Sequence, residues 1–340
     1  MKIRTLNKKG IFFTFIAVTI VAALIIIYTP SGSVVSIGAD LSVVKTRVNT
    51  VNDFVLDLEN SYFESILKVS THKAILALIA YVNDTDNNEP FDDLDKLREV
   101  FSDVVLTGDI LFQNQPIMDG NTINDWLDNM IDISRDTLNV DSEFKVNSVE
   151  ISQLRPWFVE LTLDINFSVT SETASWNVSD FIVNTELSIQ NFNDPYYLAN
   201  TSGNYENKIN KTDTEFDEWN VETVKDHIKH GTYVHFPTSQ APNFLMRFTK
   251  DISPSSCCGI ESLVNPNVLD GLPPPTFPDV DVSYADYLFW STTADCANPE
   301  LDLFTVDDIT DDYPDTKFDL GHLVLYNITQ DAQQICPPPP

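Results

Sequence analysis

Three histidines lie close together in the segment DHIKHGTYVHF, and their side chains are of a type that binds transition metals. They are His227, His230 and His235. Imidazoles hold zinc, nickel or copper when a turn gathers them at one point. Gly231 interrupts any helix face that they would share, and the spacing matches no established metal site. A metal site is therefore one hypothesis, and ordinary polar histidines are the simpler one.

An acidic run, DDITDDYPD, is the second group of side chains that could bind an ion. Calcium prefers several carboxylates on a flexible loop, which makes Asp307 and Asp311 candidate ligands. The run has no internal glycine and lacks the EF-hand order, so a solvated acidic loop is the alternative. Calcium is the one cofactor that the sequence suggests, and we expect no other.

Local signatures of catalysis are missing from the chain. It has no G-x-S-x-G nucleophile motif, no P-loop, no HExxH and no glycine fingerprint for a dinucleotide. We therefore predict that the protein is not an enzyme. A hydrolase assembled from residues far apart in the sequence is the alternative, because such sites are recognised only in three dimensions.

Two sets of residues suit an exported protein. The four cysteines are Cys257, Cys258, Cys296 and Cys336. Outside the cell they would oxidise, and we expect each of the adjacent pair to bond with one of the two distant cysteines. Six N-x-S/T sequons are candidate glycosylation sites: Asn83, Asn166, Asn177, Asn200, Asn210 and Asn327.

The first 28 residues have the pattern of a membrane anchor. Residues 1–10 are basic, and Ile11 to Tyr28 form an uncharged run just long enough to span a bilayer core as a helix. Basic residues before the span predict a cytoplasmic N-terminus, which places everything after Pro30 outside the cell. A cleaved secretory signal is the alternative, although its apolar region usually has only about 7 to 15 residues.

The charge of the chain is strongly unequal. Four basic residues precede the apolar run, which leaves 16 basic against 51 acidic side chains in the rest. Such an ectodomain repels nucleic acid, so we expect no nucleic-acid partner. The hydrophobic content of 43% is enough for a packed core.

A helical pattern follows the anchor, and no proline interrupts residues 31–82. Its apolar stripe, spaced alternately by four and three residues, is Val44, Val48, Val51, Val55 and Leu58. This spacing predicts one long amphipathic helix from about Asp40 to Val82. The stripe is either the core face of the ectodomain or a contact face for other subunits.

The periodicity then changes from helical to alternating. Asp92 to Leu106 predicts a helix, and Thr122 is a typical N-cap for another. Val159 to Val169 alternate with polar residues, between strand-like segments at 144–151 and 176–189. Three adjacent strands with short connections predict an antiparallel meander, so the fold class is α+β.

The last part of the chain has weaker signals. Asn191 to Asp217 is polar and predicts a domain boundary or a long exposed loop. Four short strands are predicted beyond it: His235–Phe236, Phe244–Phe248, Tyr287–Trp290 and Leu320–Ile328. The predicted organisation is a basic segment 1–10, an anchor 11–28, a long helix 31–82, an α+β domain 83–190, a polar loop 191–217 and a β-rich, cysteine-containing region 218–340.

Lys8, Lys9 and Gly10, followed at once by Ile11 and an apolar helix, resemble the N-terminus of archaeal type IV pilin-like proteins with a class III signal peptide. The resemblance implies cleavage after Gly10 and a retained apolar helix that packs into a filament core. Many members of that family carry a glutamate at the fifth mature position, which is Phe15 here, and typical pilins are shorter. It therefore implies a large minor or specialised subunit.

These features together predict a single-span protein of the cell membrane with an extracellular, acidic C-terminal domain. Its role would be structural or adhesive, and its partners would be the membrane and other copies of itself or related surface subunits. The alternative is a membrane-anchored ectodomain that binds a ligand, either a sugar or calcium.

Overall fold

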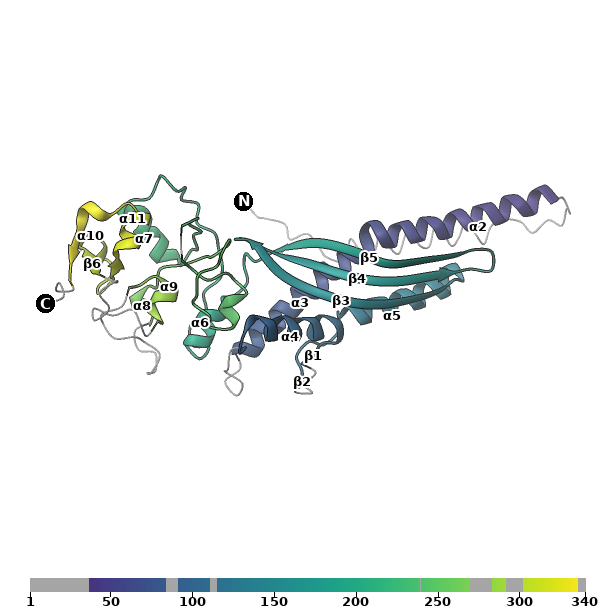
Figure 1. Cartoon of the computed structure of the whole chain (residues 1–340), viewed down its shortest axis with the longest axis horizontal. Coiled ribbons are helices and arrows are strands. Elements are labelled where there is room, and N and C mark those ends of the chain that lie inside the picture. The colour runs from purple at the N-terminus through teal and green to yellow at the C-terminus, as the bar shows by residue number, and fades with distance from the viewer. Residues whose placement is uncertain are drawn as a thin grey trace, which may run out of the picture.

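The computed structural model describes most of the chain beyond residue 36. The described residues are 37–83, 91–110, 115–238, 240–269, 283–291 and 302–335. Outside them lie the predicted anchor Ile11 to Tyr28, the processing residues Lys8, Lys9, Gly10 and Ile11, and the cysteines Cys296 and Cys336. The molecule is elongated, with a helix–sheet half (residues 37–188) at one end and a C-terminal lobe (residues 189–335) at the other (Figure 1).

One long helix forms the spine of the helix–sheet half, as the periodicity predicted. It consists of α2 (Ile37–Asp57), the single π-helical turn η1 (Leu58–Tyr62) and α3 (Phe63–Asn83). No glycine or proline lies between Gly38 and Asn83, so nothing in the backbone chemistry ends the helix earlier. At 1.5 Å per residue this spine is about 70 Å long.

The apolar stripe of the spine is mainly a core face. Val51, Val55 and Leu58 are buried, whereas Val44 is 43% exposed. Of the two roles left open for the stripe, the core face therefore applies to Val51, Val55 and Leu58, which belong to the same hydrophobic core as the sheet. The part Ser42–Asn83 is long and apolar enough to cross a membrane, but half of its most apolar window is buried inside the protein, as in a core helix.

A three-stranded antiparallel meander packs on the spine, as predicted. Its strands are β3 (Asp141–Arg155), β4 (Phe158–Thr170) and β5 (Ser175–Ser188), in the order β3-β4-β5. The inward side chains of β4 are all buried, and they are Val159, Leu161, Leu163, Ile165, Phe167 and Val169. The alternating residues of β4 therefore place one apolar face of the strand on the core and leave the polar face on the outer side.

Two further helices complete the layer against the sheet. α4 (Leu94–Thr107) contacts α3 and β3, and α5 (Ile123–Ile133) contacts α4 and β3. Thr122 caps α5 as predicted, since its hydroxyl accepts from Asp125 N while the Asp125 carboxylate accepts from Thr122 N. The remaining elements here are β1 (Asp109–Ile110), β2 (Gln115–Pro116) and the π-helical turn η3 (Ser134–Leu138).

The C-terminal lobe consists of short elements joined by long irregular segments. They are α6 (Pro195–Asn200), α7 (Val221–His230), η4 (Met246–Phe248), α8 (Pro266–Leu269), α9 (Asp286–Phe289), β6 (Leu303–Val306), α10 (Asp307–Thr310), β7 (Phe318–Asp319), α11 (Leu320–Leu325), η5 (Thr329–Asp331) and β8 (Ala332–Gln334). β6 pairs with both β7 and β8 in a small antiparallel sheet. The described part of this lobe is therefore not the β-rich region that we predicted.

The four strands predicted in the lobe are wrong. Phe244–Phe248 ends in the 3-10 turn η4, and the segments at 287–290 and 320–328 contain helices α9 and α11. His235–Phe236 has no strand partner, and the neighbouring Val234 forms only an isolated bridge with Glu261. Short apolar runs do not distinguish a strand from a buried helical turn. In α11 the helical turn is stabilised by the Asp319 carboxylate, which caps it by accepting from His322 N.

The polar segment Asn191 to Asp217 is not an exposed loop throughout. Asp194 and residues 195–199 are buried, and Tyr197 and Leu198 belong to the same hydrophobic core as the sheet. A second apolar cluster lies deeper in the lobe, around Trp219 and Tyr326. The polar composition led to the wrong prediction because the buried carboxylate of Asp194 is paired with Arg247, which lies far along the chain.

Candidate functional site

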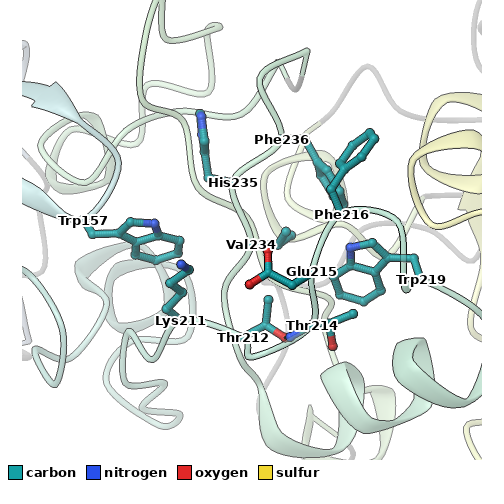
Figure 2. A pocket seen from close by; sticks show the side chains of 10 residues that line it. All are labelled: Trp157, Lys211, Thr212, Thr214, Glu215, Phe216, Trp219, Val234, His235 and Phe236. Atoms are coloured by element: carbon teal, nitrogen blue, oxygen red, sulfur yellow. The ribbon is translucent and has the colours of Figure 1, made fainter.

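A cleft of about 190 Å³ lies where the helix–sheet half meets the C-terminal lobe. The residues that line it are Trp157, Lys211, Thr212, Thr214, Glu215, Phe216, Trp219, Val234, His235 and Phe236. Figure 2 shows an aromatic ring on each side, with Trp157 facing the group formed by Phe216, Trp219 and Phe236. Aromatic walls with a few polar groups are typical of a small-molecule site.

The turn of the β3–β4 hairpin supplies one wall. Trp157 stands in the two-residue connection between these strands, and Lys211 Nζ lies 6.0 Å from the centre of its ring. The side-chain amide of Gln153 donates to the carbonyl oxygens of Arg155 and Pro156 and so holds the turn. Trp157 O also accepts from Ile189 N, which ties the turn to the start of the lobe.

The opposite wall is a packed aromatic group. Trp219 is 2% exposed, and its ring centre lies 6.0 Å from Phe236 and 4.8 Å from Tyr326. Phe216 packs on Phe236 at 5.8 Å but remains 64% exposed. An exposed phenylalanine at the mouth of a cleft is apolar area that a ligand could cover.

Polar groups complete the cleft. His235 Nδ1 lies 2.7 Å from the carbonyl oxygen of Gly259, so Nδ1 is the donor, and in this tautomer Nε2 is an acceptor. Figure 2 shows the Glu215 carboxylate directed across the cleft toward Trp157. The Nε1 of Trp219 is buried and has no hydrogen-bond acceptor among the described residues.

Backbone pairing places the two lobe segments of the cleft side by side. Tyr233 N donates to Asn210 O and Thr212 N donates to Tyr233 O, both at 2.8 Å. Val234 pairs on its other side with Glu261. Asn220 then caps α7 by accepting from Glu222 N, which sets the position of the preceding Trp219.

A buried ion cluster is hydrogen-bonded to one residue of this arrangement, Tyr233. The Arg247 guanidinium lies between the carboxylates of Asp194 and Asp286, and Nε is 2.8 Å from Asp194 Oδ2. Tyr233, which precedes the cleft segment, donates from its hydroxyl to Asp194 Oδ2 at 2.6 Å. Burial raises the pKa of the Asp286 carboxyl to about 6, against the pull of Arg247. The cluster fixes Tyr233 and therefore the backbone of the cleft.

A second buried cluster contains histidine but does not have the geometry of a catalytic triad. His322 lies between Asp319 and Glu261, with Nε2 3.1 Å from Glu261 Oε1. Burial lowers the pKa of His322, but these two carboxylates outweigh it and raise that pKa well above 6.5. The hydroxyl of Ser283 donates to Asp319 and not to the imidazole, so His322 is not placed to accept the hydroxyl proton of Ser283. We assign this cluster a structural role.

The residues predicted to bind metal do not converge. His227 is buried against Trp219, with Nδ1 2.6 Å from Thr232 Oγ1, while His230 is paired with Asp226 at the surface. His235 lies in the cleft and bonds to Gly259. Asp307 accepts from Gln333 Nε2, and no group of three or more His, Cys, Asp or Glu able to hold a metal occurs within the described ranges, Asp311 included.

The candidate glycosylation sites differ in exposure. Asn177, Asn210 and Asn327 are exposed. Of the other three, Asn83 Oδ1 is buried, Asn166 bonds to Asn147 and Asp180, and Asn200 donates to Tyr196 O. Two of the exposed side chains are also hydrogen-bonded, since Asn327 donates to Trp219 O and Asn177 to Ser175 Oγ. Asn166 and Asn177 line a second hollow, of about 270 Å³, on the outer face of the sheet. Glycosylation therefore remains a prediction at all six positions.

The cysteine arrangement differs from the expected one. Cys257 is joined to Cys258 in the structure, whereas we expected each to pair with Cys296 or Cys336. Both sulfur atoms lie within 3.5 Å of the Gln153 carbonyl oxygen, where the loop at 255–258 packs against the end of β3. The two cysteines are neighbours in the sequence, with their Cα atoms 3.7 Å apart.

Sequence reasoning missed most of the cleft. Of its lining residues only His235 was singled out, and for a different chemistry. The signal that was overlooked is the pair Phe216 and Trp219 inside an otherwise polar segment, because aromatic residues there have no periodic core face to explain them. No protein-family model, curated protein or solved structure matches this chain, so its function has to be argued from its own geometry.

Proposed function

We propose that the chain is a membrane-anchored, pilin-like subunit of a cell-surface structure. The observation that carries this proposal is the spine that runs unbroken from Ile37 to Asn83, with an antiparallel sheet packed on its second half. A long N-terminal helix followed by such a sheet is the layout that the resemblance of residues 8–16 implies. The helix begins only nine residues after the apolar run ends at Tyr28.

The two ends of the molecule suit different tasks. The start of α2 extends past the sheet at the end opposite the C-terminal lobe (Figure 1). If Ile11 to Tyr28 lies in the membrane, the spine would carry the lobe about 70 Å outward. In a filament the same geometry would expose the lobe on the outer surface. The net acidity of the ectodomain favours solubility there.

The contact with other subunits is narrower than the full apolar stripe. Val43 is 68% exposed and Val44 43%, while the rest of the predicted face from Val51 onward is buried. Assembly would therefore use the apolar run at Ile11 to Tyr28 together with the first turns of α2. The sheet-covered part of the spine would serve only as core.

Processing at Gly10 provides the test. In its own cells, the wild-type chain should yield a mature protein that starts at Ile11, measured by intact mass and N-terminal sequencing. Gly10→Leu should retain residues 1–10, whereas Gly10→Ala should still be cut because a small residue is kept. A retained Met1 in the wild type, or normal cleavage of Gly10→Leu, would exclude pilin-type maturation.

A second candidate function is ligand binding by the ectodomain, and the aromatic cleft specifically favours it. A calcium site has less support, since the acidic residues at 307–315 do not meet in a common cluster within the described part of the chain. The cleft could bind a ligand at the cell surface whether or not the protein forms filaments.

A further inference from the structure

We infer that the cleft between Trp157 and Trp219 binds a saccharide ring. Such binding would be an activity separate from anchoring or assembly, and it does not depend on processing at Gly10. Three features of the cleft favour a saccharide: the paired aromatic walls, the small volume and the kind of polar groups between the walls.

The walls suit the apolar faces of a sugar. A pyranose presents C–H groups on its faces and hydroxyls around its rim, so it packs flat on an aromatic ring and hydrogen-bonds at its edge. Trp157 and Phe216 are both partly or largely exposed at the cleft, and they come from opposite sides of it. Aromatic side chains give such contacts with little loss of conformational entropy.

The size of the cleft limits the ligand to about one ring. Its 190 Å³ is below the range of about 300–1,000 Å³ that is usual for pockets of drug-sized ligands. A monosaccharide, or the terminal residue of a longer glycan, therefore fits better than a large aromatic cofactor or a folded peptide segment.

The polar groups offer both acceptors and donors for hydroxyls. Glu215 and His235 Nε2 can accept, and Lys211 can donate. A sugar hydroxyl is both donor and acceptor and can therefore meet this mixed set.

Charge argues against the other ligand classes. An organic cation between the aromatic walls would be repelled by the ammonium group of Lys211, whose Nζ lies 6.0 Å from the Trp157 ring centre. An anion would meet the Glu215 carboxylate and the strongly acidic ectodomain. A neutral, polar ligand with apolar faces avoids both conflicts.

The sugar could come from two sources, one of them the chain itself. The sequon Asn210-Lys211-Thr212 runs directly into the cleft, because its second and third residues line it and Asn210 is exposed. A glycan on Asn210 would have a very high local concentration at the aromatic walls. The other source is a glycan on a neighbouring cell or surface molecule.

The test uses the full chain in detergent micelles, with tryptophan fluorescence titrated by glucose, galactose, mannose and N-acetylglucosamine. Wild type and Asn210→Gln are compared first. Binding that appears or strengthens in Asn210→Gln identifies the chain's own glycan as the usual occupant, and equal binding by both proteins identifies an external sugar. No binding of any of the four sugars by either protein, at concentrations up to about 100 mM where even a weak complex forms, overturns the inference.

Side-chain variants then locate the binding. Phe216→Ala should weaken the sugar by about fivefold to tenfold, which corresponds to the loss of one aromatic contact. Phe216→Tyr should restore most of the affinity, and Val324→Ala is the matched control because Val324 is 63% exposed outside the cleft. Unchanged affinity in Phe216→Ala would place the sugar elsewhere and overturn the assignment.

Discussion

The interior of this protein changes in character between the sheet and the C-terminal lobe. Behind β4 the buried side chains are almost entirely hydrocarbon, with small hydroxyl groups such as Ser70 and Thr71 among them. In the lobe the interior holds the charged side chains of Arg247, Asp286 and Glu261, each 0% exposed. Two parts of one continuous chain are therefore stabilised by different interactions.

This difference has a physical consequence for specificity. Hydrocarbon packing is non-directional and scales with the area removed from water, so a regular pattern of apolar residues is sufficient to direct it. Buried ions must instead meet partners at defined distances and angles, because an unpaired buried charge is very unfavourable. The lobe, with its short helices and long irregular segments, takes its geometry from these directional contacts.

The largest effect should come from removing the central cation of the lobe. Arg247→Met leaves Asp194 and Asp286 buried without their partner, which should lower the free energy of unfolding by about 3–5 kcal/mol. Urea denaturation of the full chain in detergent measures the loss, and limited proteolysis should map new cleavages to the lobe.

Arg155→Met is the matched control in the helix–sheet half. Arg155 is 52% exposed and pairs at the surface with Glu160 and Glu186, so its loss should cost less than about 1 kcal/mol. Equal losses in the two variants would mean that buried charge does not hold the lobe together.

A cavity in the sheet core should have the next largest effect. Leu163 is fully buried in β4, and Leu163→Ala should lower the free energy of unfolding by about 2–5 kcal/mol. Ile182→Ala in β5 is its control, since Ile182 is 48% exposed and should change stability by only about 0.5 kcal/mol. Limited proteolysis of Leu163→Ala should give new cleavages in the helix–sheet half. Cleavage confined to the lobe would contradict the division between the two regions.

Acid should weaken the lobe through His227. Burial lowers the pKa of His227 to about 4, so between pH 6.5 and 4 the unfolded chain binds a proton that the folded chain does not. The stability from this neutral imidazole is present above pH 6.5 and is lost as the pH falls toward 4. Its full size is on the order of 3 kcal/mol.

The variant His227→Gln isolates this pH effect. Its free energy of unfolding should approach that of the wild type as the pH falls from 7 to 4, measured by urea denaturation at each pH. The raised pKa of Asp286, about 6, acts in the opposite direction, since it favours the folded state as the pH falls through that value. That contribution is common to both proteins and cancels in their difference. A constant difference over this pH range would show that folding does not change the pKa of His227.

The smallest effect on stability should follow a change at the cleft mouth. Phe216 is 64% exposed, so Phe216→Ala should alter the free energy of unfolding by no more than about 0.5 kcal/mol. Trp219→Ala, only a few residues away, should cost about 3–5 kcal/mol because that ring is core to the lobe. Thermal denaturation of both variants checks the contrast, and a large loss in Phe216→Ala would assign Phe216 to the core as well.

Regular elements of this protein were determined by sequence alone. The spacing from Val44 to Leu58 predicted the spine, the alternation from Val159 to Val169 predicted the central strand, and Thr122 predicted the start of α5. Each of these signals comes from residues a few positions apart, where backbone geometry directly links sequence period to structure. A helix face or a strand face needs no distant partner to be recognised.

Only the tertiary structure decided the interior of the lobe and the position of the cleft. Arg247 meets Asp194 across 53 residues and Asp286 across 39, and Trp157 faces Lys211 from another part of the chain. A polar segment such as Asn191 to Asp217 has the same composition whether it is solvated or buried. Its tertiary partners determine whether it is buried. Directional contacts between distant residues leave no periodic trace in the sequence, and they are what build the cleft.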